Sequence, residues 1–237
     1  MHLHKHIECI KTGNPRIANT ISNDVVGAYV SVFVKYASNA MCFDMGKMDD
    51  YVGMKAVLGL CDKLPFEPCW FEFINGGQQE SIGVLCTQRE SEIIFLPVVN
   101  GIFFHHVILK NSGHIHSHPN NADFAKDITD AIMVFLSILN CKNVKTEEVK
   151  PDAALQKARA KRGKMPLFSY HVLTLRSDTP EKGDSKGGTH ASPRLHIRRG
   201  HIRRFDDGTH TWVSPCTVGD KKLGMVHKDY KYQAATA

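Results

Sequence analysis

Four short apolar segments separated by turn residues occupy the stretch from residue 69 to residue 109. They read CWFEFI, SIGVLCT, EIIFLPVV and IFFHHVIL, and the residues between them include NGGQQ, QRES and NG. Short apolar runs joined by Gly- and Asn-rich turns are typical of an antiparallel meander of strands. This feature limits the fold strongly, because a meander must bury a face against a second layer.

A long amphipathic segment follows the meander and can supply that layer. Its apolar residues recur at three- and four-residue spacing, at Phe124, Ile128, Ile132, Phe135, Leu136 and Leu139. This spacing predicts a helix over residues 122–141 with one buried stripe, capped by Asn121 or Asp123. The order of strands, helices and strands predicts an α+β fold, in which an antiparallel sheet packs on one long helix. We expect both the meander and a C-terminal basic hairpin to belong to that sheet.

The remaining segments complete the expected domain organisation. We expect residues 1–176 to form the α+β core, residues 177–193 a mobile polar loop, and residues 194–233 a basic β-hairpin region that packs on the same sheet. Within the core, residues 16–42 fit either a strand or a buried helix. Residues 52–63, VGMKAVLGLCDK, predict a short helix that ends before a proline.

Positive charge is concentrated in the second part of the chain. Residues 1–141 contain 10 Lys and Arg against 14 Asp and Glu, a net of −4, and residues 142–237 contain 20 against 10, a net of +10. A basic helix, DAALQKARAKRGK, is expected at residues 152–164. Local basic character of this kind indicates a surface that meets an anionic partner.

Several classes of protein are disfavoured by what the sequence lacks. No apolar run approaches the roughly 18 residues that a membrane helix needs, and the first fifteen residues lack the apolar stretch of a signal peptide, so we expect a cytoplasmic protein. The seven cysteines occur singly, which indicates reduced thiols rather than a disulfide framework. The sequence contains no P-loop, dinucleotide-binding or nucleophile-elbow motif, so nucleotide hydrolysis and α/β-hydrolase chemistry are not expected.

The most basic segment, RLHIRRGHIRRF at residues 194–205, places five arginines and two histidines in twelve positions. Strand alternation with a bulge at Gly200 would gather its cations over an apolar side, and FDDGT would supply a hairpin turn. Because each guanidinium presents a planar fork of donors, the segment predicts a nucleic-acid-binding surface that contacts backbone phosphates. The expected contact residues are Arg194, His196, Arg198, Arg199, His201, Arg203, Arg204 and Trp212, the last through stacking on bases.

Two other interpretations of this segment remain open. It is also compatible with a solvated edge hairpin whose charges prevent edge-to-edge pairing and whose arginines pair with acidic residues of the chain. In a catalytic variant, His196 and His201 would act as acid and base in metal-independent RNA cleavage. Whether the nucleic acid would be DNA or RNA stays open.

A second group of histidines lies in GHIHSHP, residues 113–119. With Glu80 before a G-x-L strand and Asp130 on the following helix, this segment resembles the JAMM (JAB1/MPN) zinc isopeptidase family over residues 79–132. The resemblance implies a zinc ion bound by His116, His118 and Asp130, with Glu80 as acid and base on the metal-bound water. Asp127 stands where that family has a serine. A JAMM-like zinc hydrolase is therefore the first alternative to nucleic-acid binding.

A broader resemblance covers most of residues 64–230. The pattern R-x-H-x-R-R-G-H-x-R-R followed by G-x-x-x-W-V resembles uncharacterised proteins encoded by tailed phages and prophages. The resemblance implies a phage setting, hence the host cell cytoplasm, and cargo that acts on nucleic acid or on host defence. A phage protein that binds a host protein is the second alternative.

Overall fold

The structure is a computed structural model that describes most of the chain. The described residues are 2–13, 15–18, 23–51, 53–57, 59–75, 80–110, 113–119, 122–175, 194–198, 201–213 and 216–225. The predicted loop at 177–193, together with Arg199 and Gly200, lies outside the described residues.

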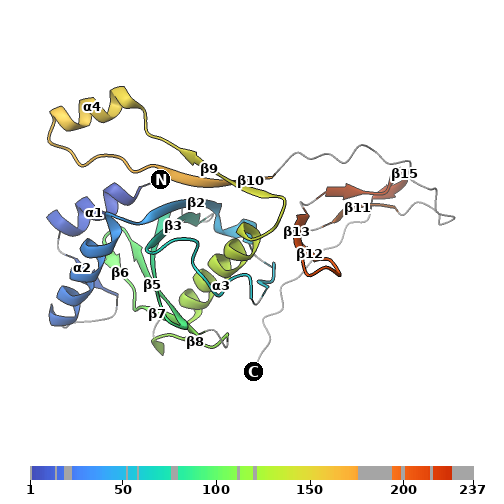
Figure 1. Ribbon diagram of the computed structural model, residues 1–237, viewed down its shortest axis with the longest axis horizontal. Coiled ribbons are helices and arrows are strands. Elements are labelled where there is room, and N and C mark those ends of the chain that lie inside the picture. The colour runs from blue at the N-terminus through green and yellow to red at the C-terminus, as the bar shows by residue number, and fades with distance from the viewer. Residues whose placement is uncertain are drawn as a thin grey trace.

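A ten-stranded mixed sheet forms the centre of the protein (Figure 1). Its main path runs in the order β1-β6-β5-β4-β3-β2-β10-β9, and β7 and β8 extend it from β5. The strands are β1 (Arg16–Ile17), β2 (Met41–Lys47), β3 (Cys69–Asn75), β4 (Glu80–Arg89), β5 (Glu92–Val99), β6 (Ile102–Phe103), β7 (Val107–Lys110), β8 (Ile115–His116), β9 (Val144–Val149) and β10 (Tyr170–Leu175). The predicted meander is confirmed from β3 to β7, where neighbouring strands pair antiparallel.

Helices cover both faces of this sheet (Figure 1). Helix α3 (Ala122–Leu139) packs on one face, and α1 (Leu3–Thr12) and α2 (Asn23–Ala37) pack on the other. The alternation of β3 explains the two cores, because Phe71 and Phe73 face α3 whereas Trp70 faces α1 and α2. The α+β fold is confirmed, and the sheet is buried by helices on two sides rather than by one.

Two local expectations change in the structure. Residues 16–42, which fitted a strand or a helix, contain β1, helix α2 and the start of β2. The helix expected at residues 52–63 is wrong: a 3-10 helix, η1 (Met48–Tyr51), is followed by turns and irregular backbone. Gly53 at φ +77° and Gly59 at φ +86° hold left-handed conformations, which interrupt a helix there.

The loop between β2 and β3 also makes the sheet mixed. The loop returns the chain to the end of the sheet at which β2 begins, so β3 pairs parallel with β2. Strand β10 also pairs parallel with β2. The predicted basic helix is confirmed as α4 (Ala153–Lys161).

The C-terminal strands form small sheets of their own beside α3 (Figure 1). Strands β14 (Cys216–Val218), β11 (Arg194–Arg198) and β15 (Asp220–Met225) make a three-stranded sheet, and β12 (His201–Arg204) pairs antiparallel with β13 (His210–Val213). The hairpin expected around FDDGT is therefore present, but it is hydrogen-bonded outside the ten-stranded sheet. Among the described residues, no helix is both long and apolar enough to span a membrane.

Candidate nucleic-acid interface

The β12–β13 hairpin is held on the body of the protein by apolar packing. Ile202 and Trp212 are cross-strand partners and share one face. Both pack against Val134 and Ile138 of α3 and against Val144 at the start of β9. Trp212, expected to stack on bases, is half-buried in this contact.

Asn143 fixes the hairpin by bonding to the backbone of Trp212. Its amide Nδ2 donates to the carbonyl of Trp212 over 2.8 Å, and its Oδ1 accepts the Trp212 N–H over 2.9 Å. The backbone N–H of Lys142 adds a bond to the carbonyl of His210 over 2.9 Å. Together these bonds extend the pairing of β13 to the turn after α3, so the hairpin has a defined orientation.

The two described arginines of the hairpin are exposed but diverge. Arg203 and Arg204 are adjacent in β12 and therefore point to opposite faces. The guanidinium of Arg203 lies 5.1 Å from the centre of the Phe205 ring, and Lys142 Nζ lies 4.2 Å from the same centre. Among the described residues, neither arginine forms an ion pair with a carboxylate, so both charges remain available to a partner.

The hairpin turn adds two acids next to these cations. Asp206 and Asp207 are exposed. Asp207 accepts bonds from the hydroxyl of Thr209 over 2.7 Å and from its N–H over 2.9 Å, and these bonds hold its pKa below the ordinary value. A polyanion would therefore have to approach the strands of the hairpin and avoid its turn.

The first part of the basic segment belongs to a different sheet. In β11, Arg194 is opposite Asp220 of β15, and Arg198 is opposite Cys216 of β14. His196, in the same strand, is opposite Val218. The described residues of the segment thus form two short strands that belong to two sheets, and His201, in β12, is half-buried. The side chains of β11, the bulge at Gly200 and the position of Arg199 lie outside the described residues.

A second basic feature is an arm built around α4, which projects from the body at the upper left of Figure 1. Asp152 caps the helix, because its carboxylate accepts the N–H of Leu155 over 2.8 Å. The side chain of Gln156 bonds the backbone N–H and carbonyl of Leu167 over 2.9 and 2.8 Å, which closes the loop after the helix. These local bonds keep the arm folded although no residue of α4 is buried.

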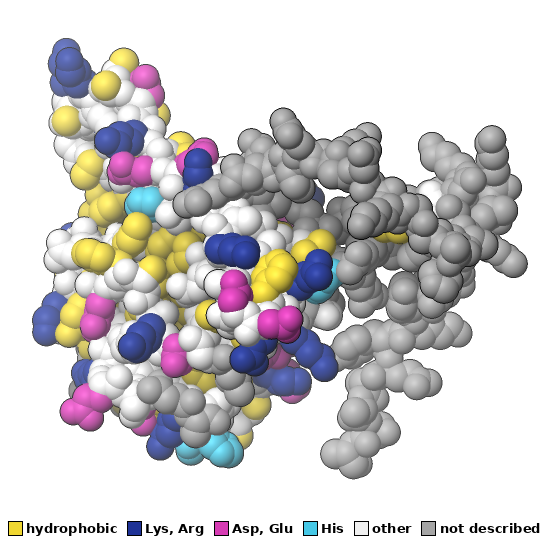
Figure 2. Space-filling model, turned by 45° about the vertical axis from the view of Figure 1, so that its right-hand side comes forward, with side chains coloured by type: hydrophobic (Ala, Val, Ile, Leu, Met, Phe, Trp, Pro, Cys, Tyr) yellow, Lys and Arg dark blue, Asp and Glu magenta, His cyan; other side chains and the backbone are white. Residues whose placement is uncertain are grey.

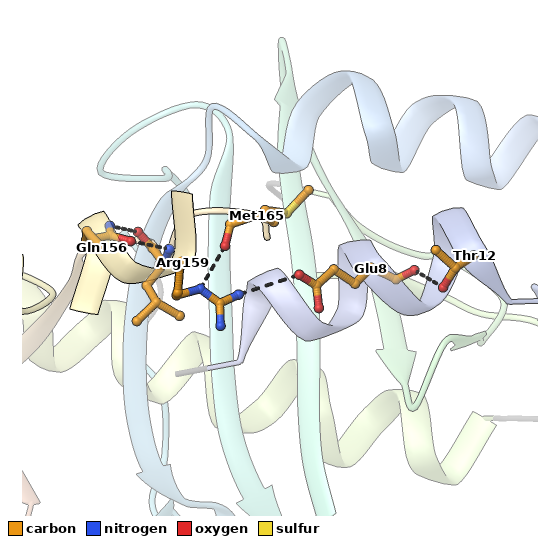
Figure 3. Close-up of polar contacts among 6 residues, drawn as sticks. Glu8, Thr12, Gln156, Arg159 and Met165 are labelled. Atoms are coloured by element: carbon orange, nitrogen blue, oxygen red, sulfur yellow. Dashed lines mark hydrogen bonds and ion pairs between the residues drawn. The ribbon is translucent and has the colours of Figure 1, made fainter. Parts of the chain in front are cut away.

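One cation attaches the arm to α1 (Figure 3). Arg159 donates from Nε to the carbonyl of Met165 over 2.9 Å and forms an ion pair with Glu8 over 3.5 Å. The other cations of the arm are exposed and form no ion pair with described residues: Lys157, Lys161, Arg162 and Lys164. Figure 2 shows Lys and Arg side chains at the end of this projection.

The sequence indicated a basic helix here but did not assign its cations to the candidate site. Lys157 and Lys161 are four residues apart, which is the spacing of one helix face. The sequence therefore already indicated that Lys157 and Lys161 share one helix face. The structure adds that this face is turned to solvent at the end of a projecting arm.

The metal ligands implied by the JAMM resemblance are not brought together in the structure. His116 is exposed in β8, and Asp130 is exposed on α3. The ring of His118 instead stacks on that of His105, with centroids 4.0 Å apart and planes 13° apart. Within the described residues, no group of three or more His, Cys, Asp and Glu side chains could hold a metal ion. The side chain of Glu80, at the start of β4, lies outside the described set.

The pKa of Asp130 is raised above its ordinary value. Partial burial penalises its charged form, Lys126 opposes this effect and Asp127 adds to it. The pKa of His105 is lowered by partial burial and by the neighbouring His118 and His106. Both shifts follow from burial and from neighbouring charged or titratable side chains.

Comparison with known families identifies the chain as a whole. No curated protein and no solved structure matches it significantly. The sequence pattern of the AcrVA2-like family, described as the anti-CRISPR type V subtype A2 family, matches residues 9–220. The expectation of a phage-type protein family is confirmed, and the matched stretch includes the central sheet, the arm and the hairpin. The chain therefore belongs to the anti-CRISPR type V subtype A2 family.

Proposed function

We propose that this anti-CRISPR protein acts by binding nucleic acid of the type V system through its backbone phosphates. The observation that carries the proposal is the set of exposed cations that lack carboxylate partners among the described residues. They occur at two places, on the hairpin as Arg203 and Arg204, and on the arm as Lys157, Lys161, Arg162 and Lys164. Clustered Lys and Arg side chains bind polyanions through counterion release.

The positive charge of this surface disfavours a second mechanism, in which the inhibitor would fill the nucleic-acid channel of a CRISPR effector. RNA-guided effectors hold the guide and target strands in a positively charged channel. An inhibitor that filled such a channel would need an acidic surface, whereas the second part of this chain has a net charge of +10, from 20 Lys and Arg against 10 Asp and Glu. Like charges repel in an interface, so the basic surface favours the nucleic acid itself as the partner.

The spacing of the two basic features sets a length for the bound strand. Strand β9, six residues long, leads from the hairpin contact towards the arm. Six strand residues span about 20 Å, which equals about six nucleotide steps along one strand of a duplex. Oligonucleotides long enough to reach both features should therefore bind more tightly than short ones.

The test is fluorescence anisotropy with labelled single- and double-stranded RNA and DNA, titrated at several salt concentrations. We expect the logarithm of the affinity to fall linearly with the logarithm of the salt concentration. Removing two contacts, as in Lys161→Gln with Lys164→Gln or Arg203→Gln with Arg204→Gln, should reduce the slope by about 1.4 for single strands. A control with the same charge change, Lys11→Gln with Lys63→Gln, alters exposed lysines elsewhere and should keep the slope. A flat salt dependence, or equal losses in test and control, would refute the proposal.

A second candidate function is binding of a protein of the host, and an apolar cavity favours it. The cavity, about 240 Å³, lies between α2 and strands β4 and β5 and is lined by Val32, Leu85, Ile94 and Leu96 among others. Val32 is 44% exposed, although it is apolar. Capture of a specific host protein that survives nuclease treatment, and that is lost in Val32→Asp, would favour this candidate over nucleic-acid binding.

A further inference from the structure

A cavity of about 390 Å³ with both polar and apolar lining lies along α1, from His2 to Cys9. Lys5, His6 and Cys9 line it from the helix, since residues three and four apart share one helix face. Ser81, at the start of β4, and Gly101, in the turn between β5 and β6, line the opposite side. No residue of the arm or the hairpin lines this cavity, so it is separate from the surface proposed above.

Two buried polar atoms in the lining have no hydrogen-bond partner among the described residues. They are Nδ1 of His6 and the hydroxyl oxygen of Ser81. The side chain of His6 is 4% exposed, so water does not satisfy it freely. Buried polar atoms are nearly always paired in folded proteins, and an unpaired one calls for a missing partner. Both atoms are closed to water, so a ligand in the cavity gives each of them a partner only when the side chains that line it shift.

The polar groups of the lining can all act as donors. Burial keeps His6 neutral by lowering its pKa to about 4, and a neutral imidazole can place its single proton on Nδ1. The hydroxyl of Ser81 also donates, and the exposed ammonium of Lys5 adds a full positive charge. Glu72, the acid whose charge acts on His6, accepts bonds from His2 and Trp70 and does not line the cavity.

We propose that this cavity binds a small oxyanion, a carboxylate or phosphate group, through Lys5, His6 and Ser81. The described residues that line the cavity include these three donors and no carboxylate, and Lys5 and His6 lie in the amino-terminal half of a ten-residue helix, toward its positive end. The amino-terminal turn of a helix favours an anion, and the lysine and the two unpaired donors fix its position.

Cys9 provides a built-in reporter for this site. It is exposed, its thiol donates to the carbonyl of Asn100 over 3.6 Å, and it lies against Gly101, where an added Cβ would come within 2.6 Å of the sulfur. The other five described cysteines, Cys42, Cys61, Cys69, Cys86 and Cys141, are buried. An anion bound in the cavity would occlude Cys9 and slow its alkylation.

The experiment measures the rate at which iodoacetamide labels Cys9, read by peptide mass spectrometry, with phosphate or acetate replacing chloride at constant ionic strength. We expect one of these oxyanions to slow labelling, by roughly tenfold at a concentration about ten times its Kd, and the one that acts identifies the group as phosphate or carboxylate. Lys5→Gln and Ser81→Ala should each abolish this protection, whereas Lys11→Gln, on the same helix but outside the cavity, should keep it. Folding of each variant is checked by circular dichroism, and Lys5→Gln changes an exposed side chain only.

Two results would overturn the proposal. One is an unchanged labelling rate with both oxyanions up to their solubility limits. The other is protection that persists in both Lys5→Gln and Ser81→Ala, which would place the anion elsewhere on the protein.

Discussion

Replacing Gly83 by alanine should destabilise the protein more than its small size suggests. The indole of Trp70 lies directly over Gly83, and a methyl group there would come within 1.9 Å of Cζ2 and 2.2 Å of Cη2. Carbon atoms in contact are about 3.5–4.0 Å apart, so the ring would have to move by about 1.5–2 Å.

The surroundings of Trp70 leave no space for that movement. The side chain is fully buried, with the rings of Phe33 and His6 centred 5.7 and 5.3 Å from it. Its Nε1–H donates to the carboxylate of Glu72 over 3.2 Å. Overpacking costs about 1–3 kcal/mol, and losing a bond to a charged acceptor costs about 1.5–3 kcal/mol more. We expect Gly83→Ala to lower the free energy of unfolding by about 3–5 kcal/mol, a large part of the usual 5–15 kcal/mol.

Urea unfolding followed by far-ultraviolet circular dichroism measures this loss, and Gly27→Ala provides the matched control. Gly27 is an exposed position inside α2, where an added Cβ meets nothing within 4 Å. Alanine there should stabilise the protein by about 0.5–1 kcal/mol, because glycine is a poor helix former. The reasoning is refuted if Gly83→Ala stays within about 1 kcal/mol of the parent protein, the lower limit of the cost of overpacking, or if Gly27→Ala loses as much stability.

Three further predictions concern the hairpin, α3 and α1. Asn143→Ala removes both side-chain bonds to the backbone of Trp212. The amide hydrogen of Trp212 should therefore exchange faster, and the free energy of the opening that allows exchange should fall by about 1–2 kcal/mol. Unchanged protection of this amide would contradict the proposed anchoring. Thr129 is fully buried, and its hydroxyl has no partner among the described residues. Thr129→Val should therefore raise the free energy of unfolding by about 1 kcal/mol. A lower free energy of unfolding, measured with urea, would show that the hydroxyl has a partner after all. Burial lowers the pKa of His6 from 6.5 to about 4. As the pH falls, the imidazole of His6 therefore takes up a proton in the unfolded chain before it does so in the folded protein. The free energy of unfolding should consequently fall between pH 6.5 and 4. The loss should be on the order of 2 kcal/mol from pH 7 to pH 5, and His6→Phe should make the urea midpoint flatter over that range.

The sequence predicted best the elements with a clear apolar pattern. The stripe from Phe124 to Leu139 predicted α3, and the short apolar segments between turns predicted the strands from β3 to β7. Helix α1 was not expected, although Leu3, Ile7 and Ile10 form a buried stripe, because histidines and a lysine fill the positions between them. Helix α2 stayed ambiguous, because its valines favour strands locally and only packing on the sheet decides for a helix.

The candidate site was predictable in composition but not in geometry. Five arginines in one segment indicated a basic surface, yet periodicity does not show that Arg198 and Arg203 belong to strands in two different sheets. That division depends on long-range pairing with β13, β14 and β15. The cavity beside α1 depends likewise on contacts between residues about 75 or more positions apart, such as His6 and Ser81, which no local pattern reveals.

The hairpin that carries Arg203 and Arg204 shares no strand with the ten-stranded sheet. It rests on α3 through Ile202, Trp212 and the backbone bonds of Asn143. Substitutions on its outer side therefore leave the folding of the scaffold almost untouched. In a contest between phage and host, this separation would let the proposed nucleic-acid surface diversify quickly while the architecture beneath it stays the same.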